Sequence, residues 1–240
     1  MKAVQLLLAA FVFGTIGAAN LFPQSDMPAS SQLKINYITK DFDVKKLDSR
    51  VWQKAESVKI GRYWSGEAAP ALRAFTVKLL WSDTALYVLF EANQTEPLVV
   101  SERPDLSKKT LKLWDRDVCE IFIAPDRADR NRYFEFEIAP TGEWIDLGIE
   151  VTPAERKTDW DYKSNMTSAA RIDKDKIVMA IKIPFVSLGS TPKAGDVWLG
   201  NLFRCVGSGS TRGYLAWSPT MTTEPAFHVP KAFGEFHFQK

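Results

Sequence analysis

Short segments of alternating apolar and polar residues, or of β-branched and aromatic residues, recur from residue 75 to the end of the chain. They are separated by turn signals such as Ser82-Asp83-Thr84, Pro140-Thr141-Gly142 and Asp173-Lys174-Asp175-Lys176. Only 184–188 suggests a helix, of a single turn. Many short strands at hairpin spacing predict an all-β, antiparallel β-sandwich or jelly roll. The predicted strands are 75–81, 85–91, 118–123, 132–139, 143–150, 169–172, 177–183, 197–206, 213–217 and 233–238, with long loops at 98–113, 152–167 and 218–231.

The N-terminus has the pattern of an export signal. Met1-Lys2 is a positively charged start, residues 3–19 are largely apolar, and Gly17-Ala18-Ala19 offers small residues for cleavage before Asn20. The apolar run is marginal for crossing a bilayer core, so a cleaved signal peptide over 1–19 is favoured over an uncleaved anchor. We therefore expect a secreted or periplasmic protein with no membrane span in its mature form. A linker is expected over 20–33 and one β-sandwich domain over 34–240.

The charges of the 240-residue chain are interspersed and sum to +2 at pH 7. Such a balance provides no field for a polyanion, so we expect no nucleic-acid partner, and we expect a monomer. The eight Trp and fifteen Phe exceed what a core of this size usually needs. Some aromatic side chains are therefore predicted to line a surface or cleft. A core position is predicted for Trp52, Trp81 and Trp198, while the positions of Trp64, Trp144 and Trp160 stay open.

The segment Trp114 to Ile123 places a Trp and a carboxylate at the mouth of a predicted strand. A Trp face can stack on the C–H surface of a pyranose, and a fixed carboxylate accepts hydrogen bonds from sugar hydroxyls. Because side chains alternate along a strand, Glu120 shares a face with Val118 and Phe122, where it needs a partner or water. The two readings are a sugar-binding carboxylate and a structural salt bridge to an Arg on a neighbouring strand.

Cys119 and Cys205 are the only cysteines. Export makes a disulfide between them chemically permissible, and two free buried thiols are equally compatible with the pattern. Two Cys and two His at these spacings match no zinc motif.

The sequence shows no recognisable arrangement of a nucleophile with a His base, nor a clearly positioned pair of catalytic carboxylates. His228 and His237 are the only histidines, and His237 lies in an alternating strand segment that favours a structural role. A glycan-cleaving enzyme would have to use Glu120 with Glu137 or Glu135 as its pair of carboxylates. Loop acids that could hold calcium are Asp115 with Asp117 and Asp159 with Asp161, although neither pair has the spacing of a calcium loop.

From Trp52 to the C-terminus the chain resembles the family 9 carbohydrate-binding modules, in the family 9-like form of the DOMON-type β-sandwich superfamily. The landmarks that carry the resemblance are Leu79-Leu80-Trp81-Ser82-Asp83 with Leu86-Tyr87-Val88, Trp114 to Ile123, Tyr133-Phe134-Glu135-Phe136 with Ala139-Pro140-Thr141-Gly142, Trp217-Ser218-Pro219, and Phe227 to Gly234.

The resemblance implies a sugar site with two aromatic walls and a Glu. The first wall corresponds to Trp114 and the Glu to Glu120. The second wall, a Trp in the family, corresponds to Phe227, and an Arg of the family corresponds to Glu137. Arg204 and Arg212 are candidates to replace that Arg, with Asn201 and Glu224 as weaker ones. The resemblance also implies a structural Ca²⁺ ion, whereas Trp217 is expected to be a buried landmark rather than a platform.

The sequence thus predicts an exported, non-catalytic protein with a saccharide ligand. A role beside glycan-degrading enzymes in polysaccharide catabolism is compatible with this prediction. One alternative is electron transfer through b-type haem, which related DOMON-type sandwiches bind. Haem would need axial ligands, for which only His228 and Met166, Met179 or Met221 are available. The second alternative is the glycan-cleaving enzyme.

Overall fold

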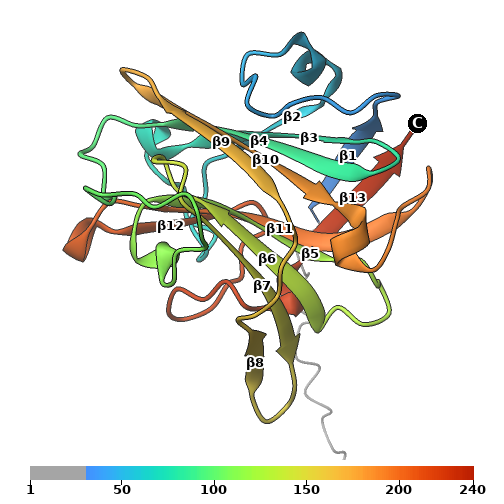
Figure 1. Cartoon of the computed structure of the whole chain (residues 1–240). Coiled ribbons are helices and arrows are strands. Elements are labelled where there is room, and N and C mark those ends of the chain that lie inside the picture. The colour runs from blue at the N-terminus through green and yellow to red at the C-terminus, as the bar shows by residue number, and fades with distance from the viewer. Residues whose placement is uncertain (1–30) are drawn as a thin grey trace, which may run out of the picture.

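The computed structural model describes residues 31–240 and contains thirteen strands and six short 3₁₀ helices (Figure 1). The all-β prediction is confirmed, and the expected turn of helix at 184–188 is η4. The strands are β1 (Gln32–Tyr37), β2 (Ser57–Ile60), β3 (Phe75–Trp81), β4 (Ala85–Asn93), β5 (Val118–Ala124), β6 (Arg132–Ile138), β7 (Trp144–Val151), β8 (Arg156–Asp159), β9 (Thr167–Ile172), β10 (Lys176–Pro184), β11 (Val197–Val206), β12 (Gly213–Ala216) and β13 (Gly234–Gln239). The helices are η1 (Arg50–Lys54), η2 (Ala71–Arg73), η3 (Leu113–Asp115), η4 (Phe185–Leu188), η5 (Gly209–Thr211) and η6 (Pro230–Ala232).

The strands form one sheet that curls back over itself into two layers. Its order is β8-β7-β6-β5-β11-β13-β1-β3-β4-β10-β9, with β12 added beside β11 and β2 beside β3. In Figure 1 the layer that holds β3, β4, β10 and β9 lies above the layer that holds β5, β6, β7 and β11, and β1 and β13 join the two. Most neighbours are antiparallel as predicted, but β1 runs parallel to both β13 and β3.

Two segments predicted from the sequence differ from those in the structure. The segment 152–167, expected as a loop, contains β8, which pairs with β7. The first strand begins at Gln32 and buries Leu33, so the last two residues of the expected linker belong to the domain. The predicted signal peptide and residues 20–30 of the linker lie outside the described residues. Within residues 31–240 no helix has the length and apolar character needed to cross a membrane.

The main core fills the space between the two layers. Trp81 and Trp198 belong to it, as predicted, and Trp217 packs against it with its ring stacked on Phe236, the centroids 5.4 Å apart. A second cluster covers the outer side of the β3-β4-β10 layer and includes Trp52. A third, which we call the outer-face cluster, covers the outer side of the β5-β6-β7-β11 layer and is built on Phe122, Tyr133, Leu147, Ile149 and Phe203.

The two cysteines are free and buried. The register between β5 and β11 pairs Cys119 with Arg204, so Cys119 and Cys205 point to opposite faces of the sheet. Cys119 accordingly lies in the main core and Cys205 in the outer-face cluster. Of the two alternatives left open by the sequence, the structure has the free thiols.

Candidate functional site

A cavity of about 840 Å³ opens on the outer face of the β5-β6-β7-β11 layer. Ligand pockets typically have volumes of ~300–1,000 Å³. Five aromatic side chains line it, and two glutamates contribute to the same lining. The aromatic residues are Trp114, Phe122, Trp160, Tyr214 and Phe227, and the glutamates are Glu120 and Glu135.

Trp114 lies in η3, just before β5, and its backbone is held by a side chain from the loop between β11 and β12. Leu113 is fully buried and anchors the turn. Arg212 donates from Nη2 to the carbonyl oxygens of Trp114 (2.5 Å) and Arg116 (2.8 Å), and from Nη1 to that of Gly207 (2.7 Å). Arg212 also lines the cavity, but three of its N–H groups hold the backbone, so it positions Trp114.

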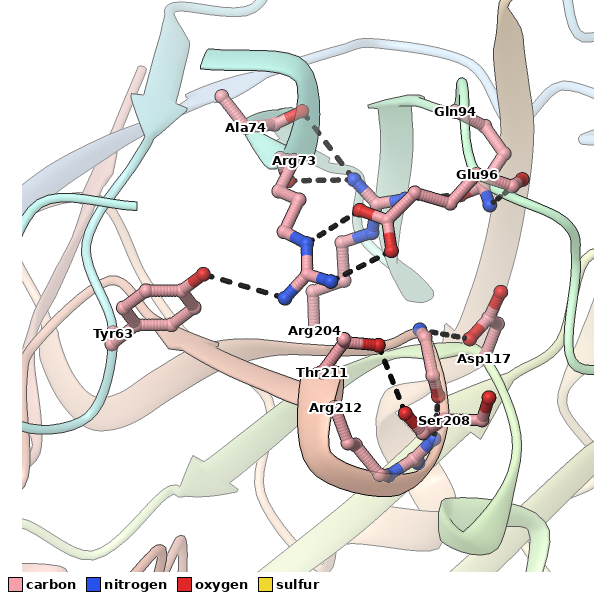
Figure 2. Close-up of polar contacts among 11 residues, drawn as sticks. Tyr63, Arg73, Ala74, Gln94, Glu96, Asp117, Arg204, Ser208, Thr211 and Arg212 are labelled. Atoms are coloured by element: carbon pink, nitrogen blue, oxygen red, sulfur yellow. Dashed lines mark hydrogen bonds and ion pairs between the residues drawn. The ribbon is translucent and has the colours of Figure 1, made fainter. Parts of the chain in front are cut away.

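A buried carboxylate, that of Asp117, holds the backbone next to Trp114. Asp117 accepts hydrogen bonds from the backbone N–H of Val99 (3.1 Å) and of Gly207 (2.8 Å). Figure 2 shows Asp117 beside the loop that carries Ser208, Thr211 and Arg212. Both oxygens of Asp117 thus hold backbone N–H groups, which gives this residue a structural role. Calcium binding by Asp115 with Asp117 stays a prediction.

The other calcium pair is exposed. Asp159 accepts the N–H of Asp161 at 3.0 Å in a local turn, and neither belongs to a group of three metal-ligating side chains in the described part of the chain. Calcium binding by these aspartates therefore stays a prediction, and we derive no role for calcium from them.

Trp160, whose place the sequence left open, lies beside Trp114 in the cavity lining. The two ring centroids are 6.2 Å apart and the planes are inclined by 43°. Trp160 follows β8 directly and is 49% exposed. A large aromatic ring that stays half in solvent beside a cavity contributes little to the core and is available to a ligand.

Phe227 forms a further part of the wall. Its ring stacks on Phe203 with centroids 4.0 Å apart and planes 11° from parallel, and Tyr214 meets its edge at 6.0 Å. The structure therefore brings Trp114 and Phe227 into one cavity lining, together with Trp160, whose position the sequence left open, and Tyr214, which the sequence had not indicated.

The carboxylates lie beneath these rings because of the pairing of β5 and β6. Glu120 is directly opposite Glu137, and Glu135 precedes Glu137 by two residues and so shares its face. All three are at most 3% exposed. Burial raises the pKa of Glu120 and of Glu137 well above the ordinary range, and the neighbouring carboxylates raise both further; burial also raises the pKa of Glu135. The hydrogen bond that Glu120 accepts among the described residues comes from the Cys205 thiol, at 3.5 Å. The structural salt bridge considered for Glu120 is therefore not formed by these residues.

His228 lies beside this floor. Its Nδ1 is 2.8 Å from the Tyr133 hydroxyl and its Nε2 is 3.8 Å from Oε2 of Glu135. Burial lowers the pKa of His228 to about 3, so the imidazole is neutral at physiological pH. Of the methionines considered as second haem ligands, Met166 and Met179 lie in the main core, on the other side of the sheet. Among the residues that line the cavity, no methionine accompanies His228.

Arg204 corrects a sequence expectation. It is 2% exposed and points into the space between the layers, away from the cavity. Figure 2 shows its guanidinium beside Arg73 and Glu96. It donates from Nη1 to the carbonyl of Arg73 (2.7 Å) and from Nη2 to Oε1 of Gln94 (2.6 Å), while Arg73 forms a bidentate pair with Glu96. Arg204 alternates with Phe203 and Cys205 along β11, and those two face the outer side, so it cannot contact a ligand there.

Two further weaker candidates differ in position. Asn201 is buried, and its amide bonds the carbonyl of Ser218 (2.8 Å) and the N–H of Leu202 and Ser218, which fixes the loop after β12. Glu224 is exposed and does not line the cavity.

These features, a curled β-sandwich with an aromatic-walled cavity on one outer face, are those of a small-ligand-binding module. The family model described as "Carbohydrate family 9 binding domain-like" matches residues 45–240, and the chain belongs to this family. No curated protein sequence matches the chain.

Solved structures share the fold at low identity. A Bacteroides uniformis protein, provisionally described as carbohydrate-binding, is 15% identical, with a TM-score of 0.70 over 88% of this chain and 100% of its own. A family 9 carbohydrate-binding module from Caldicellulosiruptor kristjanssonii in complex with cellotriose is 17% identical, with a TM-score of 0.62 over 87% and 93% of the two chains. The glucose complex of such a module from the same organism is 19% identical, with a TM-score of 0.61 over 87% and 95%.

Proposed function

We propose that this protein is exported, acts without catalysis, and binds a saccharide in the cavity between Trp114, Trp160 and Phe227. The observation that carries the proposal is the lining itself: half-buried aromatic rings surround a floor of carboxylates in one cavity. Sugars present apolar C–H faces and hydroxyl edges, and this lining offers a complement to each.

The proposed contacts divide by residue type. Trp114 and Trp160 offer faces for stacking, and Phe227, backed by Phe203, offers a smaller one. Glu120 is the hydrogen-bonding carboxylate, because it lines the cavity and its one contact is the weak thiol of Cys205. Arg212 supports the site as a positioning residue through the carbonyl of Trp114.

Glucose and short β-glucans are the first ligands to test, since solved modules of similar fold hold glucose and cellotriose. The family assignment and the predicted signal peptide support a binding protein that works outside the cytoplasm, alone as a monomer or beside glycan-degrading enzymes.

A glycan array followed by calorimetric titration of the mature protein with glucose and cellotriose tests this function. We expect saturable binding by the wild type that is at least about tenfold weaker in Trp114→Ala. Absence of binding to every glycan would contradict the proposal. Two further measurements address the rival functions: a Soret band in the visible spectrum would support haem, and release of reducing ends from glycans would support an enzyme.

A further inference from the structure

Three glutamates at and behind the cavity floor lie closer together than three ionised carboxylates can without a partner. One carboxylate oxygen of Glu120, one of Glu135 and one of Glu137 all lie within 4.8 Å of one another. Like charges directly opposite each other on paired strands destabilise a sheet, and burial removes the water that would screen them. The register of β5 and β6 places Glu120 and Glu137 directly opposite each other in this way.

Glu137 provides a second and independent observation. Its side chain has no exposure, and neither of its carboxylate oxygens has a hydrogen-bond partner among residues 31–240. Oε2 of Glu135 is equally without a hydrogen bond. Buried polar atoms are nearly always bonded, so unpartnered ones gathered in one cluster indicate a missing ligand.

The described side chains do not supply that ligand. Within residues 31–240 no Lys or Arg nitrogen lies within 4.0 Å of any of the three carboxylates, although Arg156 and Arg212 line the same cavity. The one basic group at that range is Nε2 of His228, 3.8 Å from Glu135. What the cluster lacks is a compact positive charge that reaches three oxygens at once.

We propose that Glu120, Glu135 and Glu137 bind one divalent metal ion of the kind that prefers oxygen ligands. Buried charges in proteins are paired or coordinate metals, and carboxylates suit Ca²⁺, Mg²⁺ and Mn²⁺. Mg²⁺ usually keeps several waters and binds through one or two carboxylates, whereas Ca²⁺ accepts several carboxylates in a flexible geometry. Three buried carboxylates therefore make Ca²⁺ the first ion to test and Mn²⁺ the second.

The ion would lie under the cavity rather than in its mouth. Glu120 and Glu135 line the cavity, whereas Glu137 does not and lies behind them on β6. A carboxylate that binds the ion with one oxygen keeps the other for a sugar hydroxyl, so the site is compatible with the proposed function without depending on it. These glutamates differ from the loop aspartates that the sequence suggested for calcium.

Calorimetric titration with the metal alone tests the site. The mature protein is treated with EDTA, dialysed, and titrated separately with CaCl₂, MnCl₂ and MgCl₂, and its melting temperature is measured with and without each ion. The variants are Glu137→Gln and Glu135→Gln, which keep the shape and remove one charge. Glu91→Gln is the matched control, because Glu91 is a strand carboxylate on β4 that is paired with Lys78 and Lys176 outside the cavity.

We expect one ion per chain in the wild type and in Glu91→Gln, with a rise in melting temperature, and affinity at least tenfold lower in both floor variants. No ion uptake by the wild type, or equal affinity in a folded Glu137→Gln or Glu135→Gln variant, would overturn the proposal and leave the cluster as protonated acids. Cellotriose is titrated separately into the EDTA-treated protein and, in a second series, with each ion present. Failure to bind in every series counts against the saccharide proposal, whereas failure of the metal titration counts against the metal site.

Discussion

Replacing Trp114 with Ala should separate ligand binding from stability. A pyranose stacked on the indole covers on the order of 60–100 Å² of apolar surface, and at about 25 cal/mol per Å² this contributes roughly 1.5–2.5 kcal/mol. The affinity for a saccharide should therefore fall about 10- to 70-fold. The turn itself should survive, because Arg212 holds the carbonyl of residue 114 and Leu113 remains buried. We expect a stability loss of no more than about 1 kcal/mol.

The matched control is Trp217→Ala. The Trp217 ring stacks on Phe236 and covers Gly234, where a Cβ atom would come within 2.6 Å of it. Removing it should cost about 3 kcal/mol, the scale of a large core truncation, and affect binding only through the fold. Thermal melts and calorimetric titration with cellotriose measure both variants. An unchanged affinity in Trp114→Ala, or a collapse of its melting temperature, would refute the reasoning.

The remaining predictions concern the second wall, the buried arginine and acid stability. Phe227→Trp should hold or raise saccharide affinity by up to about 1 kcal/mol through added stacking area, and Phe227→Ala should lose more than that; titrations in which neither variant differs from the wild type would place the second wall elsewhere. Arg204→Met should destabilise the fold by about 2–4 kcal/mol, because the Gln94 and Arg73 oxygens lose their donor. The affinity of the folded protein for cellotriose should stay the same. A loss of affinity without a loss of stability would show that Arg204 contacts the ligand. Burial opposes ionisation of Asp41, but hydrogen bonds from Lys182, Ser82 and Thr84 outweigh it and lower the pKa of Asp41. Near and below about pH 4 the unfolded chain therefore binds more protons than the folded one, so the stabilisation from Asp41 is present above that pH and lost as the pH falls. In denaturant melts, the free energy of unfolding of Asp41→Asn should fall less steeply with acidification than that of the wild type. Equal pH dependence of the two free energies would contradict this.

The strands were predictable because their periodicity and turn residues act locally. The segment 197–206 matches β11 end to end, and 75–81 matches β3. Local pattern also placed Trp114 at the mouth of β5, where it now lines the cavity.

The rest of the site depends on long-range pairing, which a single sequence does not specify. The carboxylate cluster exists because the β5–β6 register sets Glu120 opposite Glu137; one residue of slip would remove it. Arg204 was misplaced because alternation tells which residues share a face but not which face looks into the cavity. The position of Trp160 stayed open because β8, which carries it to the cavity rim, lies in a polar segment that gives no strand pattern.

The indole N–H signals of the tryptophans in a ¹⁵N-resolved NMR titration test the central claim most directly. Saccharide in the cavity should shift the signals of Trp114 and Trp160, assigned by single Trp→Phe variants, and leave those of buried Trp81 and Trp198 in place. A bound saccharide that shifts other tryptophans and leaves Trp114 and Trp160 unmoved would contradict the account.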